Sequence, residues 1–171
     1  MRGVAYRPDR LKVRTVNTDR ENLTDELTFT RFDRMSDRYP ERPAVIYLGE
    51  RFTYRRLRAL SERFAGALAA MGVAKSDRVM IYIANSIQWV IPFLGIQKIG
   101  AVVVPVSPIY TSHEIAYMIE DAGVETVICM DTNYGYVKET VSVTGLKRVG
   151  RKWPAASASR SAAASAIKIR N

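Results

Sequence analysis

The chain has 171 residues, and its 26 lysines and arginines outweigh 17 acids to give a formal charge of +9. An apolar content of 47% is enough to build a packed core, which excludes a wholly disordered chain. One cysteine excludes a disulfide framework and a four-cysteine zinc site, and one histidine disfavours a histidine-based metal site or catalytic triad.

A polar leader, residues 1–27, precedes the first predicted helix. Residues 28–39 place Phe32, Met35 and Tyr39 on one helical face, and a proline follows. The next residues read as a short hairpin, with strands at 44–48 and 51–54 around Gly49-Glu50.

A second helix is predicted to begin at Thr53, whose side chain suits an N-cap. Leucines, Phe64 and a methionine then recur at helical spacing. Gly72 follows the last of them, where glycine commonly ends a helix.

Three apolar runs then alternate with helical sequence. The runs are 79–84, 101–106 and 126–130. One predicted helix, 86–99, follows the first run. A second follows the next run, with Thr111 and Glu114 as its capping box and Gly123 at its end, and a third covers 132–143. Apolar strands that alternate with helices predict βαβ crossovers. We therefore expect an α/β partial subdomain, with a short β-hairpin, a βαβαβα parallel sheet and flexible termini.

No stretch of the sequence has the character of a membrane span. The longest uncharged stretch, Val79–Gln97, contains Asn85 and Pro92, and a span needs about 20 mainly apolar residues. Residues 1–20 lack the apolar core of a signal peptide. We expect a cytoplasmic protein without a transmembrane segment.

The sequence changes character after Leu146. Residues 146–171 are rich in alanine and serine and carry seven basic residues and no acid. Apolar periodicity is lost, so we expect a disordered basic tail at 146–171 behind a folded subdomain at 28–145. Because the basic residues gather at the chain ends rather than on one folded face, the pattern does not favour a specific nucleic acid as partner.

Several phrases in the middle of the chain carry a family resemblance. RFTYRRL at 51–57 is similar to a T-Y-x-E-L element, and residues 77–128 contain DRV, ANS, GAVVVPVSP and EIAYMIED in that order. Together they resemble the N-terminal subdomain of AMP-forming acyl-CoA synthetases, the adenylate-forming superfamily. SPIYTSHEI and MDTNYGYVKET look most like microbial long-chain fatty acid–CoA ligases.

The resemblance implies a reaction in which a fatty acid and ATP form an acyl-adenylate and pyrophosphate, followed by acyl transfer to CoA. The full-length family would use ATP, Mg and CoA. The sequence here contains no Ser/Thr/Gly-rich loop ending in P-K-G, no Y-G-x-T-E phrase and no T-G-D phrase. We therefore assign no catalytic, cofactor-binding or metal residue, and expect no cofactor for this chain.

Two function hypotheses remain open. The chain is either a ligase fragment that is inactive alone, or a non-catalytic α/β module that pairs with a separately encoded remainder of the ligase. The change at Leu146, in a chain with 19 arginines and seven lysines, also fits a frameshifted or truncated gene. The downstream nucleotide sequence, read in three frames, would test that hypothesis.

Residues with possible chemistry have plainer interpretations. Cys129 lies in an apolar run and reads as a buried structural thiol. His113 reads as a solvated residue of a first helical turn, and Asp121 and Glu125 as solvated charges at a helix end. Four tyrosines fit core and rim positions better than a base-stacking platform: Tyr110, Tyr117, Tyr134 and Tyr136.

The apolar runs also predict self-association. Parallel strands that are apolar on both faces need helices on both sides. We expect the crossover helices to leave one face and the sheet edges uncovered, which would favour association of the chain with itself or with a complementary ligase fragment.

Overall fold

The structure is a computed structural model that describes residues 27–150. The expected leader, apart from Leu27, and residues 151–171 of the expected tail lie outside these residues. In the part of the chain that is described, no helix has the length and apolarity needed to cross a bilayer.

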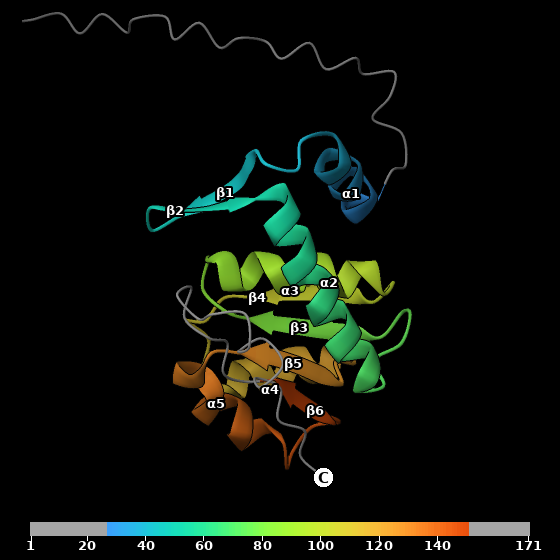
Figure 1. Ribbon diagram of the computed structural model, residues 1–171. Helices are drawn as coiled ribbons and strands as arrows, with labels where there is room; N and C mark the ends of the chain where they lie inside the picture. Colours follow the sequence, from blue (N-terminus) through green and yellow to red (C-terminus); the bar gives the residue numbers. More distant parts are fainter. Residues whose placement is uncertain (1–26, 151–171) are drawn as a thin grey trace, which may run out of the picture.

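The described residues form an antiparallel hairpin, a four-stranded parallel sheet and the helices that connect and cover them (Figure 1). In chain order the elements are α1 (Thr28–Arg38), β1 (Pro43–Tyr47), β2 (Glu50–Thr53), α2 (Tyr54–Ala70), β3 (Arg78–Tyr82), α3 (Ile87–Lys98), β4 (Val102–Val106), α4 (Ser112–Asp121), β5 (Thr126–Cys129), the 3-10 helix η2 (Asp131–Asn133), α5 (Tyr134–Thr140) and β6 (Arg148–Gly150).

Most of the predicted elements are confirmed with small changes at their ends. The hairpin turns at Leu48-Gly49, one residue earlier than expected, with φ of 49° and 80°. The Thr53 side chain caps α2 by accepting a hydrogen bond from the Arg56 amide at 3.2 Å. Helix α5 ends at Thr140, three residues before its predicted end.

The parallel sheet has the strand order β4-β3-β5-β6, from top to bottom in Figure 1. Strand β3 is central, and its Val79 pairs with Val103 of β4 and Thr126 of β5. The chain visits β4 on one side of β3 and then crosses to β5 and β6 on the other. This confirms the expected α/β fold with a parallel sheet and a short hairpin.

Helices cover both faces of the central strands. Val79 and Ile81 of β3 face one apolar cluster, which includes Leu68 of α2 and Ile91 of α3. The intervening β3 residues face a second cluster built from α4, α5 and β5. The expectation of one uncovered sheet face is therefore wrong for the described residues, and only the sheet edges at β4 and β6 remain open.

The expectation that residues 146–150 belong to a disordered tail is also wrong. Strand β6 pairs in parallel with β5, and Leu146 and Val149 are buried in the second cluster. The Arg148 guanidinium donates hydrogen bonds to the carbonyl oxygens of Met71 at 2.9 Å and Gly72 at 3.2 Å. Residues 146–150 therefore belong to the folded unit.

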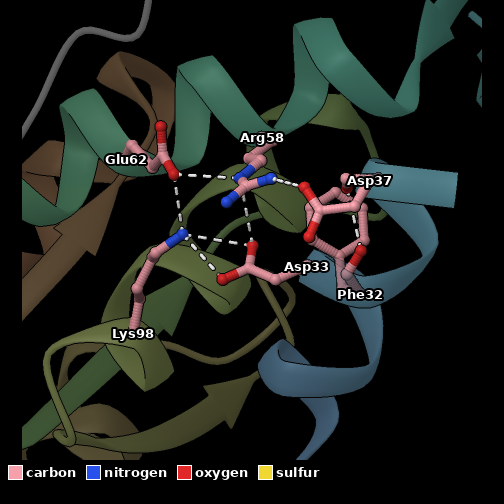
Figure 2. A network of polar contacts seen from close by, with 7 residues as sticks. Phe32, Asp33, Asp37, Arg58, Glu62 and Lys98 are labelled. Atoms are coloured by element: carbon pink, nitrogen blue, oxygen red, sulfur yellow. Dashed lines mark hydrogen bonds and ion pairs between the residues drawn. The ribbon is translucent and has the colours of Figure 1, made fainter. Parts of the chain in front are cut away.

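Helix α1 is attached to α2 and α3 by ion pairs (Figure 2) and by Phe32, which is partly buried and packs against the first apolar cluster. Lys98 Nζ of α3 lies 2.9 Å from Asp33 Oδ2 of α1 and 2.8 Å from Glu62 Oε1 of α2. Arg58 of α2 contacts Asp37 Oδ1 at 2.6 Å and Glu62 Oε1 at 3.1 Å. These five side chains tie three helices together.

Candidate functional site

The carboxyl ends of the parallel strands form the strongest candidate site in the fold. In an open α/β sheet, ligands bind beyond these ends, at the point where neighbouring strands connect in opposite directions. Here β3 leads toward β4, whereas its other neighbour β5 leads toward β6. The crevice position therefore lies between the segments that follow β3 and β5.

Two side chains at this edge hold the loop that follows β4. The Tyr82 hydroxyl, at the end of β3, donates to the Tyr110 carbonyl oxygen and lies 3.5 Å from the Pro108 carbonyl oxygen. Asn133 Nδ2, at the end of η2, donates to the same Pro108 oxygen at 3.0 Å. Because Tyr82 and Asn133 are both buried, these bonds pin residues 107–111 onto the end of the sheet.

The Tyr82 phenol is a hydrogen-bond donor at neutral pH. Burial raises the pKa of this phenol above its ordinary value of 10.0, and the neighbouring Asn133 amide opposes that shift. A protonated phenol with its hydrogen directed at a backbone carbonyl positions a loop rather than moving a proton. We therefore assign Tyr82 a positioning role.

The pinned loop leads directly into α4 through a capping box. The Thr111 amide and hydroxyl both lie 2.8 Å from Glu114 Oε2, and the Thr111 side chain accepts from the backbone of the third helical residue. The hydrogen bond from the Thr111 amide, helped by its hydroxyl, lowers the pKa of Glu114. Glu114 therefore stays ionised and caps the N-terminus of α4, as the sequence pattern predicted.

The described residues at this edge do not fit a magnesium ion or a nucleotide phosphate. The segment after β3 contains Ala84, Asn85 and Ser86 and no glycine that would let backbone amides surround a phosphate. Within residues 27–150, no group of three or more His, Cys, Asp or Glu side chains is placed to hold a metal ion. The edge offers positioned backbone and neutral polar groups, so we derive no chemical step from it.

A surface pocket of about 470 Å³ lies elsewhere, along the outer side of α4. Its lining includes His113, Tyr117 and Glu120 of α4, together with Val143 from the turn after α5. Tyr117 and Val143 are more than half exposed. The pocket lining combines one imidazole and the carboxylates of Glu114 and Glu120 with apolar atoms, and Glu114 is already engaged in the capping box.

The residues weighed from the sequence are dispersed over the fold. Cys129 is buried in β5, and His113 is exposed in the first turn of α4. Asp121 is exposed at the end of α4. Glu125 is ion-paired rather than merely solvated, because Lys147 Nζ lies 2.6 Å from its Oε1 and Arg148 3.6 Å from its Oε2.

The four tyrosines occupy the core and rim positions expected for them. Tyr110 and Tyr134 pack against the second apolar cluster, and Tyr117 and Tyr136 are exposed on α4 and α5. Sequence reasoning missed the pairing of Tyr82 with Asn133. The only signal was a tyrosine inside one apolar run and an asparagine three residues after another, which is too common a pattern to identify a contact between them.

Comparison with known proteins supplies the family. The family described as AMP-binding enzyme matches residues 32–167, which extends beyond residue 146, where the sequence was expected to change character. The long-chain-fatty-acid–CoA ligase of Salmonella typhimurium is 31% identical over 135 residues, covering 78% of this chain and 23% of the relative. The chain thus spans about a quarter of the length of this ligase and of the Escherichia coli ligases that it also matches.

Solved structures agree on the fold. A long-chain-fatty-acid–CoA ligase from Archaeoglobus fulgidus superimposes with a TM-score of 0.68 at 23% identity, over 72% of this chain and 27% of that one. The N-terminal subdomain of Klebsiella oxytoca NpsA, solved with 3-hydroxybenzoyl-AMSN, is 32% identical with a TM-score of 0.59, over 61% of this chain and 27% of that one. The chain therefore belongs to the AMP-binding enzyme family and corresponds to an N-terminal part of the acyl-CoA synthetase fold.

Proposed function

We propose that this chain provides an N-terminal part of an AMP-forming fatty acid–CoA ligase located in the cytoplasm. The whole enzyme would join a fatty acid to AMP, release pyrophosphate and pass the acyl group to CoA. The observation that carries the proposal is the alignment with long-chain-fatty-acid–CoA ligases, which covers 78% of this chain.

The part described here contributes a scaffold to that reaction. Tyr82 and Asn133 hold the loop of residues 107–111 at the carboxyl edge of the sheet. A ligand bound beyond that edge would meet a loop whose position is already determined, which lowers the entropy cost of forming the site.

We also propose that the chain forms no acyl-adenylate by itself. Adenylyl transfer needs a metal ion and donors aimed at the phosphates, where negative charge develops. The 171 residues contain no loop ending in P-K-G, and the described segments that follow β3, β4 and β5 contain no glycine-rich turn to replace it.

A second candidate is a non-catalytic module that pairs with a separately encoded remainder of the ligase. It is favoured by the coverage of both sheet faces and by strand β6, which extends the folded unit from residue 28 to residue 150. A unit with its own core can fold before its partner binds.

The test is pyrophosphate release from ATP, measured with the full chain and a series of fatty acids, beside a complete bacterial ligase as positive control. We expect no release that depends on both substrates. Such release would overturn the proposed inactivity. Adding the remainder of a related ligase as a separate polypeptide separates the two candidates, since restored activity supports the module and its absence supports the fragment.

A further inference from the structure

The turn of the β1–β2 hairpin exposes two large aliphatic side chains. Leu48 is 87% exposed and Ile46 is 64% exposed. In Figure 1 the hairpin lies above the four-stranded sheet, and its turn projects to the left. We call Ile46, Leu48 and Arg51 the hairpin tip.

The strand register shows that the apolar residues of the tip do not serve the core. Val45 pairs with Phe52, and both pack toward the first apolar cluster. Ile46 pairs with Arg51 on the opposite face, where both side chains are exposed. Because only one face of the hairpin is buried, an isoleucine on the exposed face adds no hydrophobic stabilisation to the fold.

The backbone of Leu48 adds a second, independent observation. Its φ of 49° lies in the left-handed region, and Gly49 follows at 80°, as in a tight hairpin turn that favours Asn-Gly. A leucine there costs free energy that an asparagine would save. Leu48, the most exposed aliphatic residue of the hairpin, therefore occupies a turn position at which asparagine would be more stable.

Positive charge is concentrated in the same part of the chain. Residues 27–63 contain nine arginines and five carboxylates, whereas residues 64–150 contain six basic and seven acidic residues. Arg51 forms no ion pair with any other residue between 27 and 150. The tip therefore joins exposed aliphatic groups to an unpaired cation, within a net positive segment.

We propose that the hairpin tip docks on an anionic lipid bilayer. Leu48 and Ile46 enter the boundary between headgroups and acyl chains, and Arg51 lies at the level of the lipid phosphates. Aliphatic side chains do not stack on bases, so the tip suits a membrane better than a nucleic acid. The proposal goes beyond the ligase reaction and does not depend on it.

Vesicle flotation with the full chain tests the proposal, because aggregates sink whereas vesicle-bound protein floats. The probes are vesicles of phosphatidylcholine alone and of phosphatidylcholine with phosphatidylglycerol, at low and high salt. The test variants are I46N/L48N, in which asparagine also suits the backbone at position 48, and R51Q. The matched control is V143N, because Val143 is 63% exposed and lies on the distant α4 side of the molecule.

We expect binding to anionic vesicles that falls at least about tenfold in I46N/L48N and about fivefold in R51Q, and is unchanged in V143N. Added salt should weaken it. Equal binding of I46N/L48N and the unchanged chain would overturn the proposal, as would equal binding to neutral vesicles. Binding to single-stranded RNA that is lost in R51Q and retained in I46N/L48N would assign the surface to nucleic acid instead.

Discussion

Gly95 of α3 lies directly against the backbone of α2 at Ser61. A methyl carbon placed on Gly95 would lie 2.9 Å from the Ser61 carbonyl oxygen, 2.9 Å from Phe64 Cδ1 and 3.3 Å from the Ala65 amide nitrogen. Two of these three neighbours are backbone atoms, so a side-chain rotation cannot make room. The packing of α2 on α3, and with it the first apolar cluster, requires glycine at this position.

The substitution Gly95→Ala should therefore lower the free energy of unfolding by about 1–3 kcal/mol, the usual cost of forcing an extra carbon into a packed interface. The increase in helix propensity recovers at most about 1 kcal/mol of this loss. Denaturant unfolding followed by tryptophan fluorescence measures the change, since Trp89 packs against the same cluster.

Gly66→Ala is the matched control. Gly66 is exposed on α2, and a methyl group there would meet nothing within 4 Å. This variant should be up to about 1 kcal/mol more stable than the unchanged chain, because alanine loses less backbone entropy in a helix. Equal effects of the two substitutions would show that the close approach of α2 and α3 does not exist in solution.

The ion pairs on α1 predict a local response to acid. The hydrogen bond from Lys98, aided by Arg58, lowers the pKa of Glu62 below its ordinary value of 4.5. Burial lowers the pKa of Lys98, but Glu62 and Asp33 outweigh it and the net shift is upward. A lowered carboxylate pKa stabilises the fold above pH 4.5, and this stabilisation is lost as the pH falls through the lower native value.

Hydrogen exchange of α1 amides should therefore accelerate below about pH 4.5 relative to the intrinsic rate, and earlier than exchange in β3. High salt should act in the same direction at neutral pH, because these side chains are partly exposed. Lys98→Met should remove most of the difference between pH 4 and pH 6. Unchanged α1 protection in that variant would mean that the partly buried Phe32, not the ion pairs, holds the helix.

The regular elements were predictable because their signals are local. Apolar residues at helical spacing identified α2, and the run at 79–84 identified β3. The capping box at Thr111 was visible as two residues three positions apart. Each signal lies within a few residues of sequence, where backbone preference and burial agree.

The features that were not predictable depend on distant contacts. The guanidinium of Arg148 reaches a carbonyl 77 residues earlier in the chain, and Lys98 contacts Asp33 across 65 residues. Strand β6 has only three residues, and the alanine- and serine-rich composition of the sequence after it led to the expectation that residues 146–150 are disordered. No local periodicity reports such contacts.

Tyr82→Phe tests the loop that follows β4. The variant keeps the buried ring and removes the donor to the Pro108 and Tyr110 carbonyls, which should cost about 1–2 kcal/mol. Hydrogen exchange in residues 107–111 should rise more than exchange in β5. Tyr117→Phe, on a tyrosine that is 69% exposed, should change neither quantity. A uniform loss of protection across the sheet in Tyr82→Phe would indicate a core role instead of a role in holding the loop.

Arg148→Met tests whether β6 belongs to the folded unit. The Arg148 side chain is 19% exposed and its guanidinium donates to two carbonyls at the end of α2, so its removal leaves both acceptors without that partner. Hydrogen bonds from a charged donor contribute about 1.5–3 kcal/mol, and we expect a loss of that size with faster exchange in β6. Lys147→Met is the control, because Lys147 is 62% exposed and its single ion pair with Glu125 should matter by less than about 1 kcal/mol. If both variants unfold like the unchanged chain and exchange in β6 does not change, the hydrogen bonds of Arg148 do not hold β6 to the folded unit, which contradicts this prediction.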